Sequence, residues 1–583
     1  MAEVLYASPS SACLEMSVML TGSQVFAKEL KSLGIHYVAG IPGSGSSSLV
    51  EALRTPGADI PFIQVMQEQS AVHMADGYFR ACGRPMAALL PTPLRRTKAL
   101  GAIATALADR SAMLVIGGEQ APGLPGVFEP PVMPQNASPS QLKVGKARLS
   151  VTGIEKLPAI LRKGFETMVS GDAGPVTLDI SLDVQGQSID IKGARSTNRI
   201  AAGIAKRPDP QVLQQISERL RNAQRPVLLG GGGVIAHEVT GQLLELAEAF
   251  QLPVVTTAQG KGAFPEDHPL SMGALGLAPD DPVNLLVSRA DVVIAIGCAL
   301  NGAPHQTSPD SGARPGVSQT LITVDDEKRP HPGSQYVQIT LTGDLESSLS
   351  GLCATIDTPQ RKALRRLRAP LCKSLSALRE ARDQSLIAIV SSDAAPLSAQ
   401  RPLHELRLVL ERDAILVVGA GSLQAAVRQA FPVYLPRCHL CAGGAGEVGW
   451  AVPAAIGAKL AMPARQVVCV VGDGDFLQSM QEMAVCVMHT IPVVFVVFNN
   501  SGYASLSQLH AERNANHLGG EFNLPDGKPY SPDFAVIARS FGLDAWRVEH
   551  GSQLNAVLTK AINSKGPSLV EVITARIRPA PQA

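Results

Sequence analysis

The chain has 583 residues, too many for one hydrophobic core, and this length suggests about three or four domains of roughly 150 residues each. Its 51 Lys and Arg residues nearly balance its 50 Asp and Glu residues. No strong net field therefore attracts nucleic acid or a membrane, and we expect a small-molecule partner. The first twenty residues lack a basic region, and no run of about 18 uninterrupted apolar residues occurs, so a cytoplasmic protein is predicted.

Nine cysteines are too few and too irregularly spaced for a disulfide scaffold. Cys438 and Cys441 form one Cys-x-x-Cys motif that encloses His439. A structural zinc site needs four ligands, usually from two such pairs, and there is no second pair. We therefore expect a loop with two small buried side chains, and a zinc or redox site is the lesser alternative.

Three stretches of alternating strand-like and helix-like patterns predict three α/β domains, each a doubly wound parallel sheet with helices on both faces. They span residues 1–185, 200–355 and 390–583. The strands expected in the first domain are HYVAGIPG, PFIQVM, MAALL, AMLVIGG and GPVTLDI. Those expected in the second are RPVLLGGGG, LPVVTT, ADVVIAIG and TLITVD, and those in the third are AILVVGAG, RQVVCVVGDGD, IPVVFVVFNN and PSLVEVITA.

A basic stretch, RKALRRLRAPLCKSLSALREARDQ, separates the second domain from the third. Read alone it resembles a nucleic-acid patch, but it contains no aromatic residue. Its charges are spaced for pairing along a helix, so we expect an exposed linker helix.

An acid between two glycines follows an apolar strand in the third domain. Asp473 comes directly after the strand and lies between Gly472 and Gly474. The carboxylate is therefore expected at the carboxyl edge of a parallel sheet, where ligands of open α/β sheets bind. The glycines allow close approach of the backbone, and the helix expected near Phe476 directs its free N–H groups toward a bound anion.

The next strand ends in Asn499 and Asn500. If the two strands are neighbours, Asp473, the Asn500 side-chain oxygen and the Gly502 carbonyl converge as oxygen ligands of one hard divalent cation. Magnesium completes its coordination with phosphate oxygens and water. A metal held by only three protein ligands therefore implies a bound diphosphate. The alternative is two ordinary turns, because Gly-Asp-Gly and Asn-Asn are common in turns.

The two halves at this spacing resemble the cofactor motif of the thiamine diphosphate-dependent enzymes, in which GDG is followed by NN. In this sequence 24 residues, 475–498, separate the two halves. The resemblance implies thiamine diphosphate and Mg²⁺ as cofactors, with metal ligands at Asp473, Asn500 and Gly502. It also implies cofactor contacts at a further set of residues, namely Ser422, Leu423, Gly472, Gly474, Asp475 and Tyr503.

A second segment, FIQVMQEQSAVHMADGYFRACGRP, is similar to the family pattern around its catalytic glutamate. The resemblance places this role on Glu68, which would contact the pyrimidine ring nitrogen of the cofactor. Without the flanking match, Glu68 would be interpreted as an exposed glutamate at a helix start that accepts hydrogen bonds from the N–H donors of the first turn. His73 is expected to be structural. Because the family joins these two domains from different subunits, a homodimer or a dimer of dimers is implied.

A third segment, CAGGAGEVGWAVPAAIGAKLA, resembles the family loop that forces the cofactor into a bent conformation. The wedge residue falls on Val448, which is smaller than the usual Met, Leu or Ile. The bend brings the cofactor's amino group to its reactive carbon.

The resemblance covers nearly the whole chain and is greatest for the acetolactate synthase, pyruvate oxidase and oxalyl-CoA decarboxylase group. It implies a lyase or transferase that cleaves or forms a carbon–carbon bond next to a carbonyl. The simplest case is decarboxylation of a 2-oxo acid followed by ligation to a second 2-oxo acid or an aldehyde. Alternatives are an FAD-linked oxidase, an acyl-CoA lyase or decarboxylase, and a non-catalytic member of the family.

The central domain of this family holds FAD in some members, an adenine nucleotide such as ADP in others, and nothing in several. The glycines at 230–233 do not form the dinucleotide pattern G-x-G-x-x-G. The stretch GCALNGAPHQ also lacks the arginine that contacts FAD in acetolactate synthases. FAD and ADP are therefore alternatives and not the expected cofactors.

The first domain departs from the family at the sequence LLPTPLRRTKAL, where Thr92 and Leu94 replace two glycines. Three cationic residues follow, Arg95, Arg96 and Lys98, which either clamp a carboxylate or phosphate or point to solvent. Glu119 stands where the family has a substrate-facing glutamine. The candidate substrate contacts are Gln120, Tyr503, Gln508 and His510.

Overall fold

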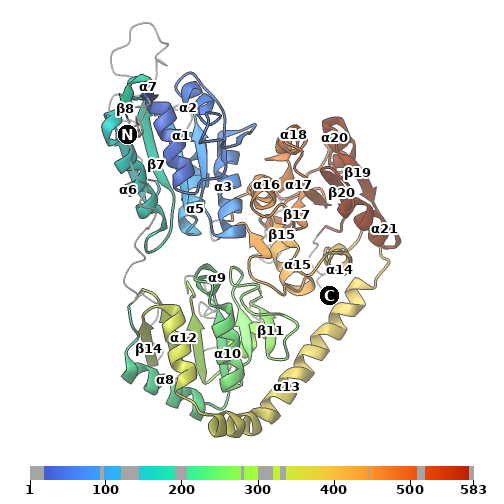
Figure 1. Ribbon diagram of the computed structural model, residues 1–583. Helices are drawn as coiled ribbons and strands as arrows, with labels where there is room; N and C mark the ends of the chain where they lie inside the picture. Colours follow the sequence, from blue (N-terminus) through green and yellow to red (C-terminus); the bar gives the residue numbers. More distant parts are fainter. Residues whose placement is uncertain are drawn as a thin grey trace, which may run out of the picture.

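The computed structural model describes residues 19–91, 97–119, 144–190, 206–276, 281–299, 319–327, 337–443, 446–507 and 519–576. Three six-stranded sheets follow one another along the chain, and a separate two-stranded antiparallel sheet pairs β1 (Met19–Thr21) with β8 (Ser188–Asp190). All neighbouring strands in the three large sheets are parallel. The expected fold of three α/β domains is therefore confirmed (Figure 1).

The N-terminal sheet has the order β3-β2-β4-β5-β7-β6. Alternate residues of its strands face two separate cores, one shared with α1 and α6 and the other with α3 and α5. Helices on both faces are what a parallel sheet requires. The strands are β2 (Val38–Gly40), β3 (Phe62–Gln64), β4 (Met86–Leu90), β5 (Met113–Glu119), β6 (Ala147–Val151) and β7 (Val176–Ser181), and the helices are α1 (Gly22–Ser32), α3 (Glu68–Cys82), α5 (Leu100–Ala108) and α6 (Leu157–Val169).

The central sheet has the order β11-β10-β9-β12-β13-β14 and also packs against helices on two sides. Its strands are β9 (Pro226–Gly230), β10 (Val254–Thr256), β11 (Ser271–Ala274), β12 (Val292–Ile296), β13 (Thr320–Asp325) and β14 (Val337–Thr342). Its helices are α8 (Pro210–Asn222), α9 (Gly232–Ala236), α10 (Thr240–Phe250), α11 (Pro282–Ser288) and α12 (Leu345–Ala354).

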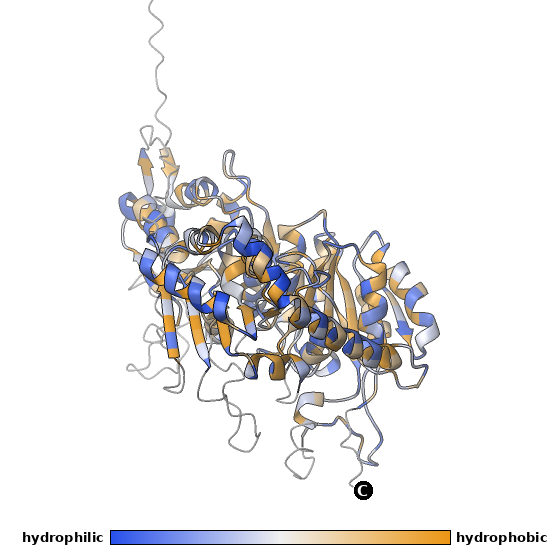
Figure 2. Cartoon of the chain, turned by 90° about the horizontal axis from the view of Figure 1, so that it is seen from below, coloured by the Kyte–Doolittle hydropathy of each residue, from blue (hydrophilic) through white to orange (hydrophobic). Residues whose placement is uncertain are grey.

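The C-terminal sheet has the order β16-β15-β17-β18-β20-β19. Its strands are β15 (Ile415–Val418), β16 (His439–Cys441), β17 (Val467–Gly472), β18 (Val494–Asn499), β19 (Asp544–Val548) and β20 (Ser568–Ile573). Its helices include α14 (Gln400–Val409), α15 (Leu423–Ala430), α16 (Ala451–Ala461), α17 (Asp473–Phe476), α18 (Met483–Met488), α20 (Phe534–Phe541) and α21 (Gly551–Ile562). Figure 2 shows the apolar strands inside and polar residues on the outer helices.

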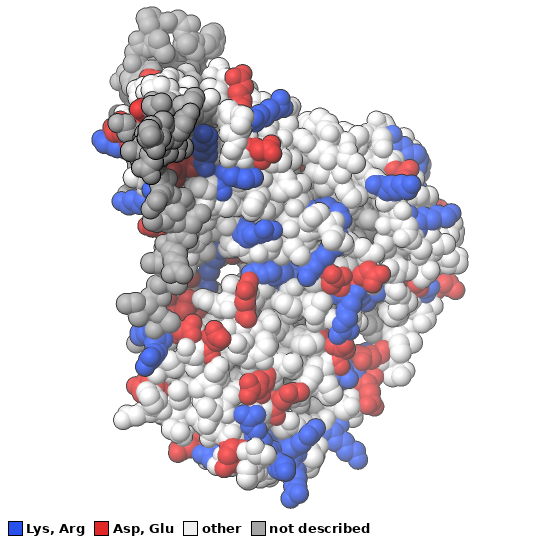
Figure 3. Space-filling view, in the orientation of Figure 1, with Lys and Arg blue, Asp and Glu red and all other residues white. Residues whose placement is uncertain are grey.

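The predicted linker is a helix, α13 (Thr358–Val390), which runs along the outside from the central to the C-terminal domain (Figure 1). Arg368 fixes its first half, because the buried guanidinium donates to the carbonyl oxygens of Phe250 and Leu220. Lys and Arg side chains gather at the lower end of the molecule, near this helix (Figure 3). The prediction of a linker helix is therefore confirmed.

The N-terminal and C-terminal domains share one core, in which α3 packs against α16. Gly77 on α3 is close enough to α16 that an added Cβ would lie 2.1 Å from the Ala454 carbonyl oxygen. Gly457 on α16 likewise packs against the backbone of Met74 on α3. A Cβ added at Gly457 would lie 1.9 Å from the Met74 carbonyl oxygen. Only glycine permits this approach of the two backbones. The helix that begins with Glu68 is thus held firmly against the C-terminal domain.

No helix in the described part of the chain combines the length and apolar character needed to cross a lipid bilayer.

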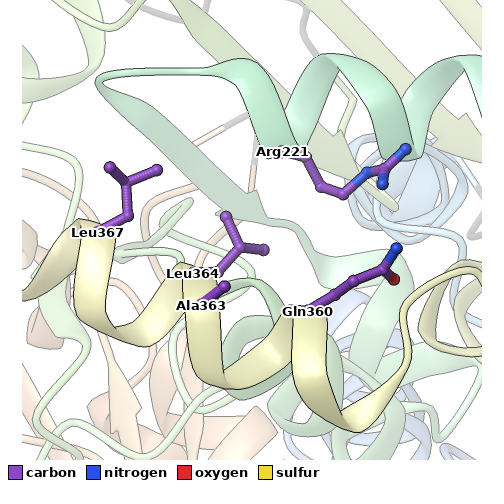
Figure 4. Close-up of a pocket in the computed structure, with 5 residues that line it drawn as sticks. All are labelled: Arg221, Gln360, Ala363, Leu364 and Leu367. Carbon is purple, nitrogen blue, oxygen red and sulfur yellow. The ribbon is translucent and has the colours of Figure 1, made fainter.

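A pocket of about 370 Å³ lies between α8 and the start of α13 (Figure 4). It belongs to the central domain and the linker, and none of its lining residues was predicted to be functional. They are Arg221, Gln360, Ala363, Leu364 and Leu367.

Candidate active site

Asp473 is the first residue of α17 and lies directly after β17, as the sequence predicts. Its side chain is 1 % exposed, and its carboxylate accepts hydrogen bonds from the backbone N–H of Gly474 at 2.9 Å and of Gly502 at 3.1 Å. Burial raises the pKa of Asp473 to about 6, although these hydrogen bonds act to lower it. A buried carboxylate of this kind is stabilised in its charged form by a cation.

The two halves of the predicted metal motif lie side by side. β17 and β18 are neighbouring parallel strands, and Gly472 pairs with Phe498, so both strands end at the same edge of the sheet. Asn500 follows β18, and its side-chain oxygen Oδ1 is buried without a hydrogen-bond partner among the described residues. Such an acceptor is costly unless something binds it.

Asn499 has a different position from Asn500. Its side-chain nitrogen donates to Glu571 Oε1 at 2.7 Å, and its Oδ1 accepts from the backbone of Ser501 at 3.2 Å. Both polar atoms of Asn499 are therefore used within the protein. The first asparagine shapes the turn, and the second leaves an oxygen free for a ligand.

Tyr503 follows the turn that carries Gly502. Its ring meets the Phe522 ring edge to face, with the centroids 5.1 Å apart, and its backbone N–H donates to the Gly520 carbonyl at 2.7 Å. The segment 519–522 therefore lies along the metal turn and supports it.

Asp475, predicted as a cofactor contact, lies within the C-terminal domain and joins two of its loops. Its carboxylate accepts hydrogen bonds from the backbone N–H of Ala420, at 2.8 Å, and of Gly449. Burial raises the pKa of Asp475 to about 6. The loop at 419–424 and the loop that carries Val448 are thereby held beside the metal turn.

Ser422 and Leu423 lie at the start of α15, where Ser422 makes no side-chain capping bond and Leu423 is buried. Val448 is half-buried in a turn between Gly446 and Gly449, both of which have positive φ angles of 59° and 89°. The structure thus brings the predicted contacts of the third domain to one edge of one sheet.

Glu68 is the first residue of α3 and is 3 % exposed, which excludes the alternative of an exposed glutamate at the helix start. The ammonium group of Lys98 lies 3.8 Å from Glu68 Oε2, while the Lys98 side chain is 70 % exposed. Of the three cationic residues, Lys98 therefore lies next to the candidate catalytic acid. Arg95 and Arg96, with Thr92 and Leu94, lie outside the described residues.

Two residues that the sequence analysis missed support the site. Glu482 is fully buried, and its Oε2 accepts from the backbone N–H of Met66, two residues before Glu68, at 3.2 Å. Arg576 donates to the carbonyl oxygens of Asn500 and Ser501 at 3.1 and 3.0 Å, so it holds the metal turn. Neither has a local sequence signal, because each contacts residues that are distant in the chain.

Several predicted contacts lie where the structure gives no side-chain position. Gln120, Gln508 and His510 are outside the described residues, and Glu119 is described only as the end of β5. Their assignment to substrate stays a prediction.

We expected the Cys-x-x-Cys motif to be a loop, and this prediction is wrong, because the motif includes strand β16. Cys438 and Cys441 are buried, free thiols, and burial raises the pKa of Cys438 to about 11. Within the described residues no group of three or more His, Cys, Asp or Glu side chains could hold a metal ion. The Asp473 and Asn500 pair uses an amide oxygen and would not form such a group.

The glycines of the central domain have a packing role. Gly231 approaches the end of β12 so closely that an added Cβ would lie 2.1 Å from the Gly297 carbonyl oxygen. This close packing explains why residue 231 is a glycine, and no bound nucleotide is needed for the explanation. FAD and ADP stay alternatives for this domain.

Three domain families match the chain in order. They are the N-terminal thiamine pyrophosphate (TPP) binding domain at residues 20–137, the thiamine pyrophosphate enzyme central domain at 213–352 and the C-terminal TPP binding domain at 419–572. The chain belongs to the thiamine pyrophosphate enzyme family. Thiamine pyrophosphate is thiamine diphosphate under another name, so the family resemblance read from the sequence is confirmed.

Individual relatives match along most of their length. The acetolactate synthase of Arthrospira platensis is 29% identical over 567 residues, which cover 96% of this chain and 94% of that protein. The acetolactate synthase isozyme 1 large subunit of Escherichia coli is 28% identical, with 95% and 93% covered. A solved structure of a thiamin diphosphate-dependent enzyme from Mycobacterium smegmatis has a TM-score of 0.76 at 26% identity and covers 96% of this chain and 100% of that chain.

Proposed function

We propose that this family member decarboxylates a 2-oxo acid and ligates the product to an acceptor carbonyl, with thiamine diphosphate and Mg²⁺ as cofactors. The observation that carries the proposal is the buried Oδ1 of Asn500, which has no hydrogen-bond partner among the described residues and lies at the same sheet edge as the Asp473 carboxylate. The similarity to acetolactate synthases over most of the chain supports this type of reaction.

The C-terminal domain would hold the metal and the diphosphate. Asp473, Asn500 and the Gly502 carbonyl offer three oxygen ligands of the kind that Mg²⁺ prefers. The backbone N–H groups at the start of α17 favour a bound anion next to that metal. Because Asp473 is buried, its carboxylate has lost surrounding water, and a bound Mg²⁺ would compensate for that loss.

When bound, thiamine diphosphate supplies the carbanion chemistry of the reaction. Glu68 would hold a proton at the pyrimidine ring nitrogen, and its burial makes that interaction strong. Val448 would support the bent form of the cofactor, and the ammonium group of Lys98 beside Glu68 would attract the substrate carboxylate.

Other parts of the proposal rest on the sequence and the family resemblance. They include a homodimer or dimer of dimers with the site between subunits, a cytoplasmic location, and the choice between lyase and transferase. An FAD-linked oxidase or acyl-CoA enzyme would differ by bound flavin absorbance or tight binding of an adenine nucleotide, and a non-catalytic member would bind the cofactor without turnover.

The test is titration calorimetry with thiamine diphosphate at increasing Mg²⁺, followed by carbon dioxide release from pyruvate and larger 2-oxo acids. We expect saturable binding that requires Mg²⁺, and turnover with at least one acid. Asn500→Ala should raise the Mg²⁺ needed for half-saturation by roughly tenfold. Asn555→Ala, on the exposed face of α21, is the control and should change nothing. Absence of Mg²⁺-dependent binding in the parent protein would refute the proposal.

A further inference from the structure

The loop that carries Val448 has contacts to two domains. Inside the C-terminal domain, the Gly449 N–H donates to Asp475. Toward the N-terminal domain, the side chain of Glu447 contacts His73 on α3 and Thr105 on α5. The site loop therefore bridges two domains through adjacent residues.

Glu447 makes its firmest contact with α5. The hydroxyl group of Thr105 donates to Glu447 Oε2 at 2.5 Å, and Thr105 is 2 % exposed. The carboxylate also lies over Gly101, because an added Cβ there would be 3.0 Å from Glu447 Oε1. The Glu447 side chain is itself 25 % exposed, and a hydrogen bond to a charged carboxylate is of the stronger kind. A side chain longer than glycine at 101 would push the carboxylate away from Thr105.

His73 on α3 faces the other oxygen of the same carboxylate. Its Nε2 lies 3.7 Å from Glu447 Oε1, and neither ring nitrogen has a hydrogen-bond partner among the described residues. The ring is 1 % exposed, and burial lowers the pKa of His73 to about 3, so the imidazole is neutral at neutral pH. A buried imidazole without partners is costly, and the Glu447 carboxylate lies 3.7 Å from its Nε2.

A second bond joins the same segment to α3. The Trp450 indole Nε1 donates to Asp76 Oδ2 at 2.7 Å, and both side chains are buried. Glu68, His73 and Asp76 lie on one helix, so this helix carries the candidate catalytic acid and contacts the loop of Val448 at two points.

We propose that Glu447 is a positioning residue, which through its hydrogen bond to Thr105 on α5 fixes the Val448 loop against the N-terminal domain that carries Glu68. This inference rests on the proposed function for the meaning of Val448, but the tether itself does not. In the proposed dimer, Glu68 and Val448 of one chain serve two different cofactor sites, and the tether keeps these two parts of the chain in a fixed relation. The short side chains typical of a tight turn would not reach α5 from position 447.

The test uses Trp450 as a reporter. The chain has 2 Trp residues, so Trp546→Phe leaves Trp450 alone, three residues from Glu447. In cofactor-free protein, Thr105→Val removes the hydroxyl group and keeps the shape, and Thr105→Ser restores it. We expect the acrylamide quenching constant of Trp450 to rise at least about twofold in Thr105→Val and Glu447→Ala, and to return to the parent value in Thr105→Ser.

Glu248→Ala is the matched control, because Glu248 belongs to the central domain, where it lies 3.4 Å from His268, whereas the loop belongs to the C-terminal domain. It should leave the quenching constant unchanged. With Mg²⁺ present, the Kd for thiamine diphosphate should rise roughly fivefold to tenfold in Thr105→Val and Glu447→Ala. The same quenching constant in parent and Thr105→Val would overturn the tether, and greater quenching with an unchanged Kd would overturn its positioning role. Failure of the parent to bind thiamine diphosphate would refute the proposed function and leave the quenching result intact.

Discussion

Two helices of this protein begin with a buried acid, and the surroundings of the two acids differ. Asp473 starts α17 and accepts hydrogen bonds from two backbone N–H groups. At the same sheet edge lies the Asn500 side-chain oxygen, which has no partner in the part of the chain that the structure describes. Glu68 starts α3 and has the ammonium group of Lys98 at 3.8 Å. The first environment is built from fixed oxygen atoms and suits a metal ion. The second has a movable side-chain cation and suits an acid that exchanges a proton.

The comparison teaches that the role of a buried acid is inferred from the groups around it, which are backbone N–H groups and an amide oxygen for Asp473 and an ammonium group for Glu68. Substitutions at the two acids should therefore have different phenotypes, one on turnover and the other on binding. If both produced the same loss, the distinction drawn between the two helix starts would be wrong.

The largest effect is expected for Glu68→Gln. Turnover should fall by roughly 10²-fold to 10⁴-fold, because the amide cannot exchange the proton at the pyrimidine ring. The Kd for thiamine diphosphate should change by less than about threefold, since the amide still forms a hydrogen bond. Stopped-flow turnover and calorimetry measure the two quantities, and far-ultraviolet circular dichroism checks the fold. An unchanged turnover would remove Glu68 from catalysis.

Asp473→Ala should instead raise the Kd for thiamine diphosphate at fixed Mg²⁺ by roughly 100-fold, because the metal loses its only charged protein ligand in the proposed set. High Mg²⁺ should restore part of the binding. Asp526→Ala, in an exposed loop, is the control for loss of an acid. Equal binding by the parent and Asp473→Ala would place the metal elsewhere.

Glu482→Gln should change the pH dependence of stability. Burial raises the pKa of Glu482 from 4.5 to about 7, so the folded protein binds this proton more tightly than the unfolded chain. The resulting contribution favours folding at acid pH and is lost as the pH rises from about 4.5 through about 7. The variant should therefore gain roughly 1–3 kcal/mol of unfolding free energy relative to the parent between pH 5 and pH 8.

Urea titrations at several pH values measure this difference. Parallel pH curves for the parent and Glu482→Gln would show that Glu482 is already charged in the folded protein. Glu549→Gln, at an exposed position beside β19, supplies the control curve.

The smallest effect is expected for Lys98→Ala. Its ion pair with Glu68 has one largely exposed partner, and such pairs contribute roughly 0–1 kcal/mol. The Kd for thiamine diphosphate should change by less than about fivefold. The KM for the 2-oxo acid should rise more than the Kd does if the ammonium group attracts the substrate carboxylate. An unchanged KM would mean that Lys98 interacts only with Glu68 and solvent.

The sequence predicts the inner strands of every sheet but misses most edge strands. In the three large sheets the expected list lacks β6, β11, β14, β16 and β19, and all five lie at the edge of a sheet; it also lacks β1 and β8 of the two-stranded sheet. Inner strands are buried on both faces and read as continuous apolar runs. Edge strands such as β14 and β19 have exposed residues at several positions, so their sequences resemble loops.

The same reasoning separates the predicted parts of the site from the missed ones. Asp473 and Asn500 follow apolar strands, and the resemblance identifies Glu68 by its neighbours in sequence. Glu482 and Arg576 act on backbone atoms of segments distant in the chain, so their roles appear only when the three-dimensional contacts are present. The spacing of residues along a sequence identifies local motifs, whereas a contact between distant segments produces no pattern in the sequence.

Arg576 gives the extreme C-terminal part of the fold a role in assembling the metal turn. Its guanidinium group reaches the carbonyl oxygens of Asn500, Ser501 and Phe522, which come from two separate segments. A truncation that ended at residue 575 would keep every strand of the sheet and still release both segments from their common anchor. A purification tag should therefore be added after residue 583 and should not replace the final residues. A protein shortened before Arg576 would lose activity because the metal turn is no longer held, even if its catalytic residues are intact.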